Sequence, residues 1–240
     1  MEPTLIWILV SVLGGFVLAL LLGRGLVPAL RALKAGQSIR EVGPKWHQGK
    51  AGTPTMGGIV FILSSLLCIV TGWHAMRETG DYKHLLVLAL ALMFGLIGFA
   101  DDFIKVKKKR NLGLTGLQKL VLQVLAACLF LAGMHFTNAL TYDLYIPFVR
   151  EPLVHIPPLV YLALSVFIIV GCVNAVNLTD GSDGLATGVT LPVMLFFTLV
   201  SMTAKQWDLA TFPATLVGAL GGFLFYNFYP AKTFMGDTGS

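Results

Sequence analysis

The chain has 240 residues, of which 56% are hydrophobic and only 12% are charged. Soluble domains carry roughly 25% charged residues, so this sequence lacks the charged surface that a water-soluble protein of its length needs. The net charge of +5 is better explained by membrane topology than by nucleic-acid binding, because lysines and arginines accumulate in the cytoplasmic loops of membrane proteins.

Seven stretches are apolar enough to cross a bilayer, whose hydrocarbon core of about 30 Å requires roughly 20 apolar residues in a helix. We expect them at Thr4–Gly23, Met56–Trp73, His84–Ala100, Leu120–Phe136, Pro158–Val176, Leu185–Thr203 and Phe212–Tyr229. The third and fourth are short. No repeat and no soluble insert separates the spans, so the sequence predicts one all-α polytopic membrane domain over residues 1–240.

The first span has no basic residue before it, and its apolar run is too long for the core of a signal peptide, so we expect it to be retained. The cysteines Cys68, Cys128 and Cys172 lie far apart inside apolar runs, without the spacing of a zinc site or a disulfide framework. They are interpreted as small packing residues.

Lysine and arginine are distributed unevenly over the connections between the spans. Segments 24–55 and 101–119 are rich in both, whereas the opposite side holds only Arg77, Lys83, Arg150 and Lys205. The positive-inside rule therefore places the N-terminus outside and the two basic segments in the cytoplasm.

Four polar motifs fall on the same predicted side. They are Lys50–Gly58, Asp101-Asp102, Asn174–Gly184 and Met235–Ser240. Because the loops on one face of a helical bundle can meet, these motifs predict a common site at the inner leaflet. The outer loops contain nothing comparable.

Asp101 and Asp102 follow directly on the apolar run 94–100. Adjacent carboxylates repel, and residues next to each other on a helix point about 100° apart, so both would line one site only near a helix end. A divalent cation or the basic run Lys105–Arg110 would relieve the repulsion. The alternative is a pair of solvated acids at the end of a helix.

Asn174 and Asn177 have the i,i+3 spacing of one helix face, and Asp180 and Asp183 repeat this spacing across a glycine-containing turn. Oxygen ligands of this kind suit Mg²⁺, which binds one or two carboxylates together with substrate phosphates. The alternative is a turn that is merely capped by Asn and Asp side chains.

The glycines around Asp237 would let backbone N–H groups approach an anion while the carboxylate holds a cation. Phe234 could stack on a base or anchor the chain at the interface. Lys50 and the helix start after Thr55 offer a second anion site, although the order is not that of a Walker A loop. Together the motifs indicate phosphoryl transfer between a cytosolic anion and a lipid, through positioning and charge neutralisation.

Four motifs carry a resemblance to a known family. They are Gly52-Thr-Pro-Thr-Met-Gly-Gly58, Asp101-Asp102-Phe103, Asn174-Ala-Val-Asn-Leu-Thr-Asp-Gly181 and Phe234-Met-Gly-Asp-Thr-Gly-Ser240. They resemble those of the polyprenyl-phosphate N-acetylhexosamine-1-phosphate transferases, and within this superfamily the phospho-N-acetylmuramoyl-pentapeptide-transferases of bacteria. The resemblance covers the whole chain.

The resemblance implies a reaction of peptidoglycan synthesis at the bacterial inner membrane. UDP-MurNAc-pentapeptide and undecaprenyl phosphate would give lipid I and UMP, with Mg²⁺ required. Asp101 and Asp102 match paired acids tied to the lipid phosphate nucleophile and its deprotonation, and Asp237 matches the metal-binding catalytic acid, with Asn177 as a second ligand. The matching substrate-binding positions are Lys50, Thr55, Asn174, Asp180 and Asp183 for the pocket, Asn227 and Phe234 for uridine, and Lys105, Lys109 and Lys119 for phosphates.

Two departures from the family pattern accompany these matches. Members have about ten spans and a His-rich loop near the C-terminus, so a chain with seven spans is expected to be a fragment. Ser182 also stands where the family usually has leucine.

Three alternatives stay open at this point. One is a transferase of GlcNAc-1-phosphate, and another is an ion-coupled transporter, although transporters place their acids near the membrane midplane. Direct attack by the lipid phosphate and a two-step route through a covalent aspartate are both compatible with the motifs. Bilayer lipid is an expected partner and nucleic acid is not, and formation of a homodimer is left open.

Overall fold

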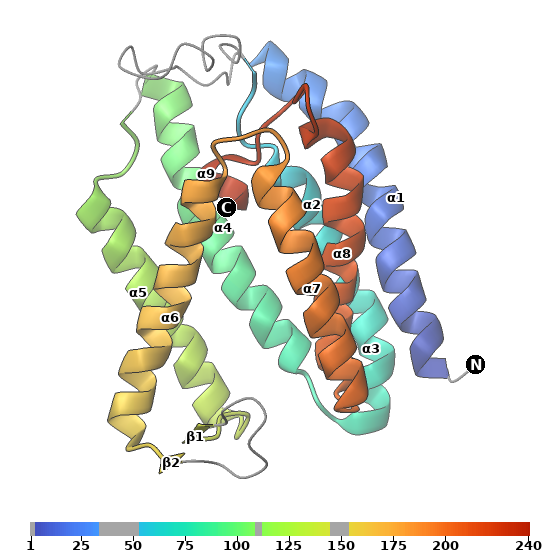
Figure 1. Ribbon diagram of the computed structural model, residues 1–240, viewed down its shortest axis with the longest axis vertical. Coiled ribbons are helices and arrows are strands. Elements are labelled where there is room, and N and C mark those ends of the chain that lie inside the picture. Colours follow the sequence, from blue (N-terminus) through green and yellow to red (C-terminus); the bar gives the residue numbers. More distant parts are fainter. Residues whose placement is uncertain (1–2, 34–52, 109–111, 145–153) are drawn as a thin grey trace.

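The computed structural model describes residues 3–33, 53–108, 112–144 and 154–240 (Figure 1). In these ranges six helices are long and apolar enough to cross a membrane. They are α1 (Pro3–Ala32), α4 (Lys83–Lys108), α5 (Gly116–Phe136), α6 (Pro158–Thr179), α7 (Leu185–Thr203) and α8 (Trp207–Asn227). The predicted all-α membrane fold is confirmed. The described strands are a two-residue antiparallel pair, β1 (Asp143–Leu144) and β2 (Val154–His155).

The second expected span is interrupted. It consists of α2 (Gly58–Ser65) and α3 (Leu67–Thr79), which meet at Leu66. The hydroxyls of Ser64 and Ser65 donate to the carbonyls of Val60 and Ile62, and such serine pairs bend apolar helices by competing for backbone acceptors. The expected apolar span Met56–Trp73 is therefore helical from Gly58 onward, with a local distortion at Leu66.

The third and fourth spans are longer than expected. Helix α4 continues past Ala100 to Lys108, and α5 begins at Gly116, where Thr115 and Gln118 form a capping box. Hydropathy marks where an apolar run ends, whereas a helix can continue beyond it, since lysine is a good helix former. The expected helix end at Asp101-Asp102 was wrong for this reason.

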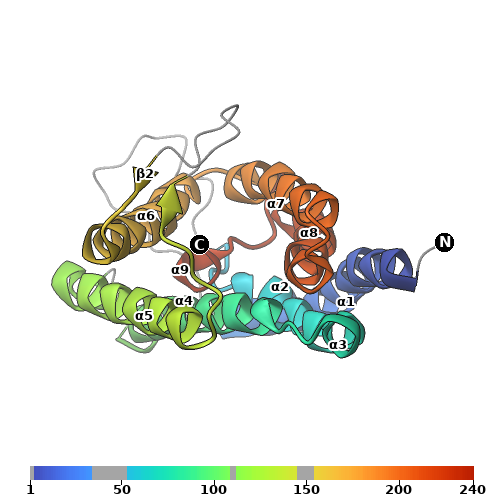
Figure 2. The same cartoon turned by 90° about the horizontal axis from the view of Figure 1, so that it is seen from below.

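Helix α8 lies among α1, α2, α3 and α7 and packs on all four (Figure 2). In the most apolar 18-residue stretch of each helix, 67% of α8 is buried, compared with 6% of α6. Gly218 and Gly222 bring α8 into backbone contact with α1, since a Cβ at Gly218 would overlap the Val12 carbonyl. Small residues of this kind allow close packing of membrane helices.

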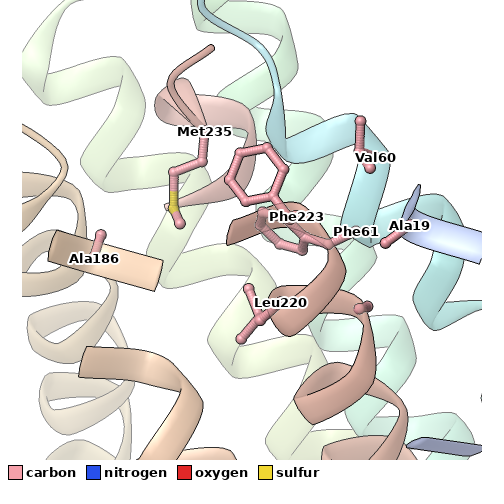
Figure 3. Close-up of a cluster of buried hydrophobic side chains, with 8 residues drawn as sticks. Ala19, Val60, Phe61, Ala186, Leu220, Phe223 and Met235 are labelled. Atoms are coloured by element: carbon pink, nitrogen blue, oxygen red, sulfur yellow. The ribbon is translucent and has the colours of Figure 1, made fainter. Parts of the chain in front are cut away.

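A cluster of buried apolar side chains lies between α8, α2 and the C-terminal segment (Figure 3). Phe61 and Phe223 meet edge to face at 5.3 Å, and Met235 packs against them. This cluster fixes the position of Met235, and so of the residues that follow it.

Candidate active site

The C-terminal segment ends in a four-residue helix, α9 (Gly236–Gly239), which packs on α4 and α2 (Figures 1 and 2). The N–H groups of Gly57 and Gly58 donate to the carbonyls of Phe234 and Met235, each at 2.9 Å. A Cβ at Gly98 of α4 would overlap the carbonyl of Asp237. Three of the four predicted motifs therefore meet here, and Asn177 and Asp180 of the fourth bond to the same segment. Gly98, which belongs to no predicted motif, is what lets α9 reach α4.

Three carboxylates converge at this contact. Oxygen atoms of Asp101, Asp102 and Asp237, hereafter the acid cluster, lie within 4.8 Å of one another, and Asp101 and Asp102 are buried. The two neighbours on α4 point in different directions, as their positions require. Asp101 accepts from the backbone N–H of Leu114 at 2.7 Å, whereas Asp102 accepts from the N–H and the hydroxyl of Thr238 at 2.9 and 2.7 Å. Both reach the site because α9 and the segment around Leu114 enclose α4 from two sides.

Two lysines neutralise the acid cluster. The ammonium of Lys105 lies 2.5 Å from Asp101, 2.7 Å from Asp237 and 3.8 Å from Asp102. Lys119 lies 3.3 Å from the same Asp237 oxygen. A cation already occupies the centre of three carboxylates, which shows that this donor set accommodates a positive charge. Carboxylate oxygens are also the ligands that hard divalent cations prefer, so the residues present fit a metal ion.

Asn177 lies beside Asp237, as predicted. Its amide nitrogen donates to Asp237 at 2.7 Å and to the hydroxyl of Ser240 at 2.8 Å. In this arrangement the side-chain nitrogen of Asn177 faces Asp237 and orients its carboxylate. The side-chain oxygen of Asn177 would face a metal at Asp237 only after rotation of the amide group by about 180°. Asn174, on the same face of α6, donates to Gln123 of α5 at 2.8 Å.

The environment of Asp237 favours its charged form. Burial raises the pKa of this carboxyl, but its hydrogen bonds with Asp101, Asn177 and Lys105 together outweigh burial and hold the pKa below its ordinary value. Asp237 is therefore suited to hold a cation.

Asp180 and Asp183 hold the segment that leads into α9. Asp180 accepts from the N–H of Gly236 at 2.9 Å, and Asp183 accepts from the N–H of Ala231 at 3.0 Å. Burial, together with the charges of Asp102 and Asp237, raises the pKa of Asp180 to about 7, against the opposing effect of the Gly236 hydrogen bond.

Asn227 and Phe234 are buried in this structure, at 0% and 3% exposure. The side-chain oxygen of Asn227 accepts from the Thr187 hydroxyl at 2.6 Å, and its side-chain nitrogen donates to the backbone carbonyl of Thr233 at 3.0 Å. Their contacts with uridine stay predictions, and they require this segment to open. Thr55 is half-buried next to Pro54, whose carbonyl accepts from the N–H of Phe234 at 2.9 Å. Lys50 and Lys109 lie outside the described residues.

An apolar cavity of about 190 Å³ borders the acid cluster. It extends from Asp237, Thr238 and Ser240 to Leu216 and Phe212 on α8. The charged side chains of the acid cluster thus lie next to an apolar space between membrane helices.

Comparison with known proteins gives consistent results. The model of glycosyl transferase family 4 matches residues 84–240, and signature 1 of phospho-N-acetylmuramoyl-pentapeptide-transferase matches residues 50–62. Proteins with that name from Bacillus subtilis and Clostridium acetobutylicum are 46% and 45% identical to this chain over 97% of its length, and the alignments cover 71% of each relative. A third, from Carboxydothermus hydrogenoformans, is 46% identical over 96% of the chain and 71% of its own length. With its acid cluster at the ends of membrane-crossing helices and these matches over nearly its whole length, the chain belongs to the phospho-N-acetylmuramoyl-pentapeptide-transferase family.

Proposed function

We propose that this protein transfers phospho-MurNAc-pentapeptide from UDP-MurNAc-pentapeptide to undecaprenyl phosphate, which gives lipid I and UMP. An oxygen of the lipid phosphate forms a bond to the phosphorus that carries the sugar, and the bond from this phosphorus to the UMP oxygen breaks. The observation that carries the proposal is the acid cluster with two lysines beside an apolar cavity. Cationic groups suited to a diphosphate beside an apolar space suited to a lipid support this reaction.

The charged side chains have separate tasks in this reaction. Lys105 and Lys119 bind the diphosphate of the nucleotide, since ammonium groups complement its charge. In the proposed reaction Asp101 or Asp102 accepts the proton of the lipid phosphate, and the hydrogen bonds from Leu114 and Thr238, which fix their positions, support this role.

Mg²⁺ is the proposed cofactor, and Asp237, with Asn177 as the second ligand, would hold it beside Asp101 and Asp102. When bound, it supplies neutralisation of the diphosphate charge. We also propose that the site faces the cytoplasm from the bacterial inner membrane, because lysines and arginines gather at this end of the helices. A homodimer stays a prediction.

The proposal is tested by release of UMP from UDP-MurNAc-pentapeptide in detergent with undecaprenyl phosphate and MgCl₂. The Asp237→Ala variant should lose Mg²⁺-dependent turnover, and Asp102→Asn should lower the rate by a factor of about 10² or more. The matched control is Asp81→Ala, which removes an acid at the other end of α4. Unchanged turnover in Asp237→Ala would remove this residue from the mechanism.

Two further arms of the assay separate the alternatives. UDP-GlcNAc should neither replace nor compete with UDP-MurNAc-pentapeptide, and efficient use of UDP-GlcNAc would move the chain to the other branch. Release of UMP without lipid would favour the covalent route over direct attack.

A further inference from the structure

A second cavity, of about 450 Å³, lies between the C-terminal half of α1 and the end of α8. Its lining includes Arg24 and Arg31 of α1 and Lys232 of the segment after α8, and we call it the basic cavity. It shares no lining residue with the acid cluster or with the apolar cavity beside it. The function proposed above makes no use of it.

The charged residues that line the basic cavity in the described part of the chain are all cations. Arg24 and Arg31 are about two helical turns apart, so they lie on one face of α1 with Val27 between them. Among the described residues, no carboxylate lines the cavity and none of the three cations forms an ion pair with an acid. Lysines and arginines that only set membrane topology need not lie close together, whereas these three line the same cavity. An anion in the cavity would relieve their mutual repulsion.

The floor of the basic cavity is rigid and apolar. The ring of Tyr226 packs on Gly23, where a Cβ would overlap the ring, and its hydroxyl donates to the Leu20 carbonyl at 2.7 Å. Val27 is buried beside it. The N–H of Lys232 donates to the Tyr226 carbonyl at 2.8 Å, and its ammonium lies 4.8 Å from the centre of the Phe225 ring. The position of the third cation is therefore fixed by the floor itself.

The depth of the basic cavity indicates the kind of anion. Helix α1 is apolar up to Gly23 and carries its first basic residue at Arg24. Phe16, Val17 and Leu21, just below, are exposed on the outside of the bundle. In a membrane the cavity would lie where the hydrocarbon meets the headgroups. Basic clusters at this depth attract anionic lipids, and guanidinium groups bind phosphate in a bidentate manner.

We propose that the basic cavity binds the headgroup of an anionic phospholipid, with the phosphodiester on Arg24, Arg31 and Lys232 and the glycerol end on the apolar floor. The proposal does not depend on the reaction that the acid cluster performs. Because Lys232 lies five residues before Asp237, a bound lipid steadies the segment that carries this acid.

The test measures thermal unfolding and native mass spectra of the chain in phosphatidylcholine nanodiscs with and without phosphatidylglycerol. The wild type should gain stability and retain a phosphatidylglycerol molecule. The Arg24→Gln/Arg31→Gln variant should bind this lipid about 30-fold more weakly, because each basic residue at an anionic surface contributes roughly a factor of five. The matched control, Lys107→Gln/Lys108→Gln, removes two exposed charges from the end of α4 and should bind normally.

Several outcomes would overturn the proposal. Equal losses in both double variants would show a general surface-charge effect. Protection by millimolar inorganic phosphate alone would make this a free-anion site, and protection by undecaprenyl phosphate but not phosphatidylglycerol would assign it to the acceptor substrate. If the double variant unfolds in pure phosphatidylcholine, lipid binding is measured on the Lys232→Gln variant instead. This variant should bind phosphatidylglycerol more weakly than the wild type, and unchanged binding would contradict the proposal.

Discussion

The ammonium of Lys105 occupies the centre of the acid cluster, within 2.7 Å of both Asp101 and Asp237. The paired acids, Asn177 and Asp237 could be predicted as site residues from their residue types and spacing. The central position of Lys105 could not, because the sequence does not say which of several neighbouring lysines turns inward. A bound metal ion would compete with this ammonium for the same carboxylate oxygens.

Replacement of Lys105 by Met should therefore have two opposite effects. Without divalent cation it should destabilise the protein by about 1–3 kcal/mol, because the acid cluster loses its central counter-charge and keeps only Lys119 beside Asp237. With MgCl₂ the rise in melting temperature should be larger than in the wild type, since the cation no longer competes with an ammonium. Differential scanning fluorimetry in detergent measures both, with the exposed Lys107→Met as control. An equal or smaller Mg²⁺ shift in Lys105→Met would contradict the competition.

Asp180 should make stability fall as pH rises. Its pKa in the folded protein is about 7, above the ordinary 3.8, so between these values the folded state holds a proton that the unfolded state has lost. The contribution is complete below about pH 4 and lost as pH rises through 7, at up to about 1.4 kcal/mol per pH unit. Asp180→Asn should flatten the melting temperature between pH 4 and 8, measured without divalent cation. A variant that keeps the wild-type slope would show that another group is responsible.

At the scale of the helices, hydropathy located six of the membrane-crossing segments but misplaced several of their ends. The acids at positions 101 and 102 lie inside α4, where Lys105, Leu114 and Thr238 provide the partners that compensate their burial. The break at Leu66 follows from two adjacent serines, which a hydropathy average does not register. The close approach of α9 depends on a missing side chain at Gly98, and a missing side chain inside an apolar run gives no motif.

Gly98→Ala should separate the two halves of the site. The new methyl group would overlap the Asp237 carbonyl, so α9 must move away from α4 and carry Asp237 away from the paired acids. We expect turnover to fall by a factor of about 10², even though alanine is favoured over glycine in a helix by about 1 kcal/mol. Gly171→Ala on α6 is the matched control, since nothing lies within 4 Å of its added Cβ. Comparable activity of the two variants would contradict the close contact.

The far end of α4 depends on an acid from another helix. Asp208 of α8 is buried and accepts from the backbone N–H of Lys83 at 3.0 Å, which caps the first turn of α4. Asp208→Ala should lower the free energy of unfolding by about 1–3 kcal/mol, and Asp208→Asn, which keeps a side-chain acceptor, by less. Asp81→Ala removes only an exposed partner of Lys83 and should cost less than about 1 kcal/mol. Thermal unfolding in detergent ranks the three, and an Asp208→Ala variant as stable as Asp81→Ala would exclude the cap.

At the scale of the whole molecule, the basic residues gather at the end of the helix bundle that carries the acid cluster. The ends of α1 and α4 and the start of α5 carry Arg24, Arg31, Lys105, Lys107, Lys108 and Lys119, all at the end where the acid cluster lies. A nucleotide substrate is made in the cytoplasm, so the proposed reaction requires this end to face inward. The same distribution of charge predicts that orientation independently, through the positive-inside rule.

Helix α4 is 26 residues long, which corresponds to roughly 39 Å, so the chain crosses the membrane between its two ends and returns along α5. Leu112, before α5, and Thr141, after it, are exposed positions on opposite faces. In a variant whose exposed cysteines Cys128 and Cys172 are replaced by serine, a cysteine at 141 should react with a membrane-impermeant maleimide in intact spheroplasts. A cysteine at 112 should react only after lysis. Labelling of position 112 in intact spheroplasts would turn the acid cluster outward and remove the cytosolic nucleotide as its substrate, whereas labelling of both positions from outside would mean that α5 does not cross the membrane.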